Sequence, residues 1–183
     1  MSHSHPEVAG YVDGRAVPRA LVDDRIDALR RGPRSAALPV IGSSEDRQLA
    51  RWVAQVVLTE QLCEAEARAR GLPESPGEGP GLDQRAAVEL GSIYAAAYAG
   101  SAAVRAVYSA VTQAVEPPEE EVASLRRYRP AVPLEELRGQ IREAARRRAF
   151  AHWLDAGRAA RLTLVPGLEH PGDPHQPDNH HRH

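Results

Sequence analysis

The chain lacks lysine altogether, and all 23 of its basic residues are arginine. This excludes chemistry that needs a lysine amine, such as Schiff-base formation or phosphate binding by a P-loop lysine. Aromatic residues are scarce as well, at 4% of 183 residues, so alanine, valine and leucine must fill the interior. Small aliphatic side chains favour closely packed helices over an aromatic-rich β-sandwich. We therefore expect a mainly α-helical fold.

The only cysteine, Cys63, excludes an internal disulfide and a thiolate-rich metal site. It lies within a helical pattern, and we interpret it as a small buried hydrophobe rather than a nucleophile. A net charge of −2 supplies no global field towards nucleic acid or an anionic membrane. Residues 1–7 are polar, no signal-peptide apolar region follows them, and no apolar run is long enough to span a bilayer. We expect a cytoplasmic protein.

The order of the elements follows from turn residues and apolar spacing. Asp13-Gly14 separates two short β-prone arms and predicts a hairpin with a type I′ turn. Apolar and polar residues alternate over residues 161–165, as they do in a strand. Trp52 is the best marker of the core. We expect one domain over residues 1–167, with a flexible Gly- and Pro-rich linker at 71–82 and a tail at 168–183. Apolar spacing predicts about six helices, over residues 18–32, 44–70, 83–98, 101–115, 117–129 and 133–157.

The last fourteen residues, 170–183, carry five histidines and two aspartates. Imidazole and carboxylate are the ligand set of Zn²⁺, Ni²⁺, Cu²⁺ and Fe²⁺, so the tail is a candidate metal site, with a solvated tail as the alternative. If the strand at 161–165 pairs antiparallel with residues 8–12, both termini leave one small sheet and seven of the eight histidines share a neighbourhood. The candidate ligands are His3, His5, His170, Asp173, His175, Asp178, His180, His181 and His183.

Two further polar features have both a structural and a functional interpretation. His152 precedes Asp155 by three residues, and we favour a histidine at the margin of the core over a general base. A run of arginines is compatible with a phosphate or acidic-partner site, but a solvated helix face is the commoner outcome, and we disfavour nucleic-acid binding. The arginines are Arg126, Arg127, Arg129, Arg142, Arg146, Arg147 and Arg148.

Three segments together resemble a known family. Residues 12–17 read Val-Asp-Gly-Arg-Ala-Val, with Leu21 at the start of a helix. The long helix ends in Ala-Arg-Ala-Arg-Gly-Leu at 67–72, and residues 115–122 read Val-Glu-Pro-Pro-Glu-Glu-Glu-Val. These segments are similar to signatures of the SurA-type and PrsA-type foldases, the parvulin-associated chaperone domains. The resemblance covers residues 8–72 and, more weakly, 112–165.

The resemblance implies a helical domain closed by a terminal hairpin and a returning C-terminal helix and strand. A parvulin isomerase module is often inserted in that family. Here only four residues separate Arg129 from Leu134, and the usual His-Ile-Leu strand is absent. The resemblance therefore implies a chaperone domain without prolyl isomerase activity.

Our leading hypothesis is a chaperone or accessory module that binds an extended peptide or a partner protein in an apolar groove. A second hypothesis is a metal-dependent enzyme of small-molecule metabolism on the same scaffold, with ligands from the tail and His152 or Tyr98 as proton-transfer group. A third is metal delivery or storage. Aromatic and aliphatic side chains suited to an apolar groove are Trp52, Val56, Tyr94, Tyr98 and Tyr108, and the tyrosines are interpreted as wall residues rather than catalytic acids.

Overall fold

The computed structural model describes residues 7–73 and 81–179, and over these residues the fold is mainly helical, as predicted. Seven α-helices, three β-strands and two short 3₁₀ helices are present in the described part of the chain. Their bounds are β1 Val8–Val12, β2 Arg15–Pro18, α1 Ala20–Arg31, η1 Ser35–Ala37, α2 Ser44–Ala69, α3 Gln84–Leu90, α4 Ser92–Gly100, α5 Ala102–Thr112, α6 Glu119–Tyr128, α7 Leu134–Arg161, β3 Leu162–Leu164 and η2 Pro177–Asn179.

Contacts between residues divide the chain into two compact units. Unit 1 comprises residues 1–66 and 157–183, and unit 2 comprises residues 67–156. Unit 1 thus joins the N-terminal elements to the last turn of α7, β3 and the C-terminal residues. The centre of the predicted 71–82 linker lies outside the described residues.

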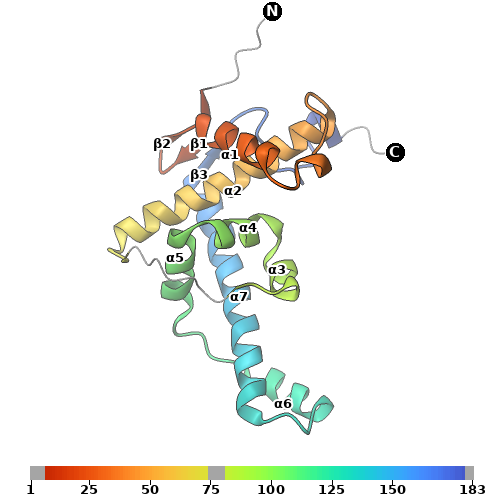
Figure 1. Ribbon diagram of the computed structural model, residues 1–183. Coiled ribbons are helices and arrows are strands. Elements are labelled where there is room, and N and C mark those ends of the chain that lie inside the picture. The colour runs from red at the N-terminus through yellow and green to blue at the C-terminus, as the bar shows by residue number, and fades with distance from the viewer. Residues whose placement is uncertain (1–6, 74–80, 180–183) are drawn as a thin grey trace, which may run out of the picture. The chain divides into compact units, whose positions relative to one another are not determined.

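The predicted hairpin and the predicted strand pairing are both confirmed in unit 1. Asp13 and Gly14 have positive φ values of 50° and 75°, as a type I′ turn requires. β3 pairs antiparallel with β1, placing Leu162 opposite Val12, so the sheet order is β2-β1-β3. Figure 1 shows this sheet with α1 and α2. Residues near both ends of the chain therefore meet in one sheet.

β1 lies so close to α2 at Gly10 that a side chain there would force a neighbouring group to shift by a few tenths of an ångström. A Cβ atom on Gly10 would lie 3.0 Å from Cδ2 of Leu58 and 3.0 Å from the Thr163 carbonyl oxygen. Leu58 is buried together with the apolar residues that surround it on α2. The absence of a side chain at Gly10 lets the sheet pack directly on this helix.

One helix predicted within unit 2 is wrong. Residues 83–98 were expected to form a single helix, but the chain breaks at Gly91, which has a φ of 89°, and α3 and α4 lie on either side. A left-handed residue cannot continue an α-helix, and glycine adopts that conformation at little cost. This break raises the number of helices above the six expected.

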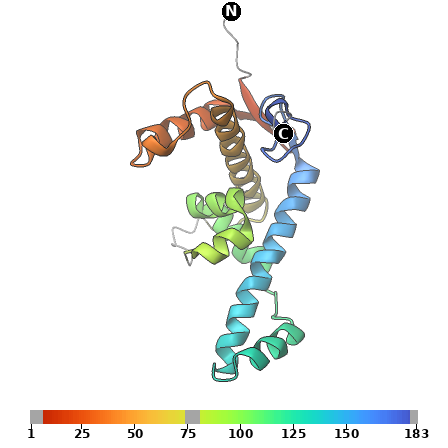
Figure 2. The ribbon, with the colours of Figure 1, turned by 90° about the vertical axis from the view of Figure 1, so that its right-hand side faces the viewer.

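The α6 and α7 helices of unit 2 form a hairpin. Figure 1 and Figure 2 both show α6 beside the first half of α7. Arg138 and Arg148 on α7 pair with Glu119 and Glu121 on α6. The chain passes from α6 to α7 through residues 129–133, which are too few to hold an inserted domain.

Two other expectations, one about the end of the last helix and one about Trp52, are wrong. Gly157 was expected to mark the frayed end of the last helix, yet α7 continues to Arg161, where β3 begins. Trp52 was expected to mark the core, but it is only half-buried, and its neighbour Arg51 is buried instead. None of the helices within residues 7–73 and 81–179 combines the length and the apolar character needed to cross a bilayer.

Candidate functional site

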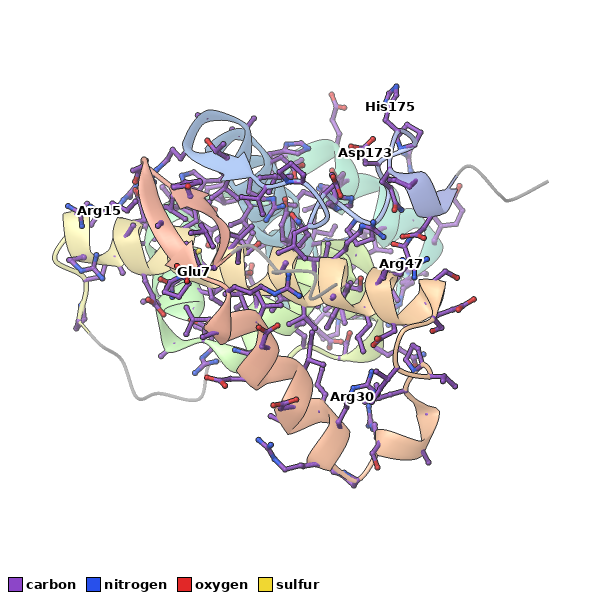
Figure 3. The ribbon with its side chains drawn as sticks, turned by 90° about the horizontal axis from the view of Figure 1, so that it is seen from above. Glu7, Arg15, Arg30, Arg47, Asp173 and His175 are labelled. Carbon is purple, nitrogen blue, oxygen red and sulfur yellow. The ribbon has the colours of Figure 1, made fainter. Side chains whose placement is uncertain are left out.

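The C-terminal segment, residues 168–179, is docked on the first half of α2 rather than solvated. Leu168 and Gln176 are both buried. Figure 3 shows the end of this segment, with Asp173 and His175 labelled, on the same side of the molecule as Arg47 of α2. The described part of the tail is therefore docked through Leu168 and Gln176, while His170 and His175 remain exposed to solvent.

Four polar side chains stand at every fourth position of α2, and we call them the α2 stripe; the first three of them contact this segment. A spacing of four residues places side chains on one face of a helix. Three of the four members are buried although they are polar, and Arg51 is only 3% exposed. The members of the α2 stripe are Arg47, Arg51, Gln55 and Thr59.

Two arginines of the α2 stripe hold one carboxylate of the C-terminal segment. Asp178 accepts a hydrogen bond of 2.6 Å from Nη2 of Arg47 and one of 2.5 Å from Nη1 of Arg51. These hydrogen bonds, that from Arg47 first, lower the pKa of Asp178 to about 2. The carboxylate is therefore ionised across the physiological range and forms a charge-assisted contact with both guanidinium groups.

The deeper half of the α2 stripe binds backbone and side chains of unit 1 through amide and hydroxyl groups. Nε2 of Gln55 donates to the carbonyl oxygen of Leu168 at 3.0 Å. Arg158, in the last turns of α7, donates to Oγ1 of Thr59 at 2.7 Å and to the side-chain oxygen of Gln55. Since Arg158 precedes β3, this contact ties the end of α7 to α2.

The fit between the segment and α2 leaves buried polar atoms without a hydrogen bond. They include Nε of Arg51, Oε2 of Glu169 and Oε1 of Gln176. The Arg51 and Glu169 atoms form an ion pair at 3.5 Å, which is too long for a hydrogen bond. Gln176 uses only its amide nitrogen, which donates to the carbonyl oxygen of Pro171.

Four predicted metal ligands lie in the described part of the segment. Asp173 accepts from the backbone N–H of His175 at 2.9 Å, and its Oδ1 lies 3.2 Å from Nδ1 of the same histidine. Nδ1 of His170 accepts from the Gly172 N–H, and burial, with the nearby Arg158, lowers the pKa of His170. Asp178 is held by arginines.

The remaining predicted ligands lie outside the described residues. Among the residues that the structure does describe, no group of three or more His, Cys, Asp or Glu side chains is arranged to hold a metal ion. The metal site is therefore still a prediction. The ligands outside the described residues are His3, His5, His180, His181 and His183.

The residues predicted to line a peptide groove fall in both units. Trp52 and Val56 lie on α2 in unit 1, and the tyrosines Tyr94, Tyr98 and Tyr108 lie in unit 2. Val56, Tyr98 and Tyr108 are buried, whereas Trp52 and Tyr94 are half-buried.

Tyr98 and Tyr108 belong to an aromatic cluster in unit 2, and Tyr94 is held by a hydrogen bond of its hydroxyl. The ring centroids of Tyr98 and Tyr108 are 5.4 Å apart, and those of Tyr108 and Phe150 are 5.1 Å apart, both with edge-to-face geometry. Tyr94 donates to Asp155 through its hydroxyl. Burial raises the pKa of Tyr108 to about 12, which keeps its hydroxyl protonated. These contacts fit the interpretation of the tyrosines as wall residues.

The arginines of α7 are neutralised by glutamates of unit 2. Arg147 pairs with Glu89 at 2.7 Å and Arg142 pairs with Glu116 at 3.1 Å. Arg146 and Arg148 pair with further glutamates in the same way. The solvated-face interpretation fits Arg142 and Arg148, which are exposed. Arg146 and Arg147 are half-buried instead, and the guanidinium group of Arg146 lies over the Tyr108 ring.

The prediction for Cys63 is confirmed, whereas the prediction for His152 is wrong. Cys63 is fully buried, and burial raises the pKa of its thiol to about 12, which confirms its interpretation as a small hydrophobe. His152 was expected at the margin of the core, but it is exposed on α7. That expectation is wrong because the apolar face of α7 at this turn is formed by Phe150 and Leu154, which are both buried.

A second feature of unit 1 is a loop, residues 38–43, that presents two aliphatic side chains to solvent. Val40 is 79% exposed and Ile41 is 75% exposed. We call residues 38–43 the apolar loop. Figure 3 shows Arg30, which extends from α1 and donates to the carbonyl oxygen of Pro39 at 3.3 Å. The same guanidinium forms a 2.5 Å contact with Asp46.

Further hydrogen bonds fix the backbone of the apolar loop at the start of α2. The N–H of Gly42 donates to Oδ2 of Asp46 at 2.8 Å, and the N–H of Ser43 donates to the Val40 carbonyl oxygen at 3.1 Å. The Ser43 hydroxyl accepts from the N–H of Asp46, as expected of a serine that caps a helix. The exposure of Val40 and Ile41 is thus built into a well-bonded turn.

A family model described as "Family of unknown function (DUF7158)" matches residues 8–45, which span β1, β2, α1, η1 and the apolar loop. The search of curated proteins found no match. The search of solved structures found none either.

Proposed function

We propose that the chain is a protein-binding accessory module of the chaperone type, without prolyl isomerase activity, and that the apolar loop contacts an apolar segment of the partner protein. The observation that carries the proposal is the paired exposure of Val40 and Ile41 on a hydrogen-bonded turn. Burying one such side chain stabilises a complex by about 1.5–3 kcal/mol. Because the turn is fixed before binding, little conformational entropy is lost.

The arrangement of unit 1 supports the chaperone type. A terminal hairpin, a long helix and a C-terminal strand that returns to the hairpin are what the resemblance to SurA-type and PrsA-type domains implies. The short passage from α6 to α7 supports a module that lacks the isomerase domain.

The burial of most predicted groove residues moves the proposed contact to the apolar loop. Val56, Tyr98 and Tyr108 are each at most 5% exposed, so an incoming peptide has little surface to touch there. Trp52 and Tyr94 are half-buried, and they stay predictions as groove residues.

The test is a double variant, Val40→Ser with Ile41→Ser, assayed for suppression of light scattering by heat-unfolded citrate synthase. The wild-type chain should suppress the scattering, and the double variant should lose most of this effect. The matched control is Val88→Ser, because Val88 is 76% exposed on α3 in unit 2. All variants should keep the wild-type unfolding midpoint. Equal suppression by the double variant, or none by the wild type, contradicts the proposal.

A further inference from the structure

We infer that the α2 stripe is a second binding site, occupied in the isolated chain by the C-terminal segment, and that in trans it accepts an acidic, proline-containing segment of a partner protein. The inference goes beyond the proposed function, because it concerns another surface of unit 1 and another ligand chemistry. Three observations support it: the contacts that hold the C-terminal segment on α2, the buried polar atoms that these contacts leave without a hydrogen bond, and the turn that connects the segment to β3.

The C-terminal segment is held as a bound peptide is held. One side-chain amide, that of Gln55, donates to the backbone carbonyl of Leu168, whose own side chain is a buried anchor. Two guanidinium groups, from Arg47 and Arg51, grip the carboxylate of Asp178. The segment is thus recognised by a backbone hydrogen bond, a buried aliphatic side chain and a carboxylate bound by two guanidinium groups. These three contacts fix the direction of the bound segment and the spacing between its aliphatic and acidic residues.

The internal occupant does not complete the site. Nε of Arg51, Oε2 of Glu169 and Oε1 of Gln176 are buried without a hydrogen bond. Nε of Arg51 is the one of these three atoms that lies on α2, and its 3.5 Å ion pair with Glu169 is too long for a hydrogen bond, which weakens the docking of the segment. A segment from another protein that places an acceptor closer to this nitrogen gains an advantage over the internal one.

The segment is attached so that it can leave without disturbing the sheet. Directly after β3 the chain turns at Pro166 and Gly167, with the N–H of Leu168 donating to the Val165 carbonyl oxygen at 3.1 Å. Gly167 has a φ of 90° and no atom within 4 Å of a Cβ placed on it. The turn therefore separates the strand pairing of β3 from the contacts that hold the segment.

The chemistry of the external ligand follows from that of the internal one. An aliphatic residue fills the position of Leu168, and a carboxylate ten residues later reaches Arg47 and Arg51. Prolines between them restrict the unbound conformations and reduce the entropy lost on binding. The positive charge of the two arginines selects an acidic segment over a basic one.

The experiment uses the full chain and a fluorescein-labelled peptide with this chain's own sequence 166–179. The double variant Leu168→Ala with Asp178→Asn releases the internal segment, and its peptide affinity is measured by fluorescence anisotropy. We expect it to bind at least tenfold tighter than the wild type, where the internal segment competes at an effective concentration on the order of millimolar. A peptide carrying Asn in place of Asp178 should bind at least tenfold more weakly.

A matched control adds Arg51→Gln to the double variant, and peptide binding should then disappear while circular dichroism still shows a folded chain. If the double variant does not fold, the wild type is used with saturating peptide, and hydrogen exchange of the amides at Asp173 and His175 is followed. Both amides are hydrogen-bonded in short turns of the segment, and these turns lose the support of α2 on displacement, so their exchange rates should rise.

The inference is overturned if released and wild-type chains bind the peptide equally, or if saturating peptide leaves the exchange rates unchanged. It is also overturned if light scattering shows that the released variant pairs into dimers that exclude the peptide, since the occupant is then a second copy of this chain. The variant with Val40→Ser and Ile41→Ser should bind the peptide normally when combined with the releasing changes. Failure at the apolar loop and failure at the α2 stripe are therefore distinguishable.

Discussion

Nη1 of Arg51 lies 2.5 Å from Oδ2 of Asp178, although 127 residues separate the two in sequence. The same carboxylate also accepts from Arg47, so a single aspartate is shared by two arginines one helical turn apart. The side chain of Arg51 is 4% exposed, whereas that of Arg47 is 53% exposed. One ion-paired carboxylate therefore connects the buried and the solvated ends of the same surface.

This difference in burial predicts unequal effects of equal substitutions. Arg51→Gln leaves Glu169 without its cation and opens a buried site, and we expect a loss of about 3 kcal/mol of unfolding free energy. Arg47→Gln removes an exposed and solvent-screened partner of Asp178, and we expect a clearly smaller loss. Urea unfolding of the three proteins measures both values. Equal losses would mean that burial of Arg51 does not govern the strength of the contact.

Acid should release the C-terminal segment through Asp178. Its pKa is lowered to about 2 by the two arginines, from an ordinary value of about 3.9. A carboxyl group with a lowered pKa stabilises the folded state fully above its unfolded pKa, and this contribution disappears as the pH falls from about 4 to about 2. The measured quantity is the stability difference between wild type and Asp178→Asn. It should be constant near neutral pH and shrink over that acid range, and a difference that grows on acidification would contradict the assignment.

Local signals predicted the hairpin and the long helices, because their causes are near in sequence. Asp13-Gly14 accepts the positive φ values of a type I′ turn, and the run from Ser44 contains no proline or glycine to stop a helix before Gly71. The pairing of β1 with β3 was also predictable, since a single further β-prone segment needed a partner. The break at Gly91 was not, because one glycine within an alanine-rich pattern is compatible with a continuous helix.

The docking site on α2 was missed for a different reason. Polar residues at positions 47, 51, 55 and 59 have a spacing of four that is visible in the sequence, but this spacing alone does not indicate a docking site. Whether such a polar stripe faces water or a partner depends on residues more than a hundred positions away. Periodicity reports a face, but it does not report what covers the face.

Because β1 lies close to α2, a single methyl group added at Gly10 should lower the stability of the fold. Gly10→Ala places a Cβ 3.0 Å from Leu58 and from the Thr163 carbonyl, and the required shift of the strand should cost about 1–3 kcal/mol. The matched control is Gly139→Ala in α7, where no atom lies within 4 Å and the change should stabilise the chain by up to about 1 kcal/mol. Thermal and urea unfolding give both values. A neutral Gly10→Ala would show that the sheet does not pack tightly on α2.

Metal binding by the tail has a prediction that separates two of its candidate ligands. Asp178 is already bound by Arg47 and Arg51, so recruiting it to a metal would require breaking both contacts. Nε2 of His175 has no such constraint, because only its Nδ1 faces Asp173 and the side chain is 91% exposed. Imidazole in its neutral form is a ligand of Zn²⁺ and Ni²⁺.

We therefore expect His175→Ala to weaken Zn²⁺ binding by the untagged full chain at least tenfold and Asp178→Asn to leave it unchanged. Calorimetry with protein purified without chelator measures both affinities. Weakening by Asp178→Asn equal to that by His175→Ala would place Asp178 in the coordination sphere and require the C-terminal segment to leave α2 when the metal binds. The absence of a stoichiometric site in the wild-type chain would contradict metal binding by the tail altogether, while the contact between Asp178 and the arginines would still account for the docked segment.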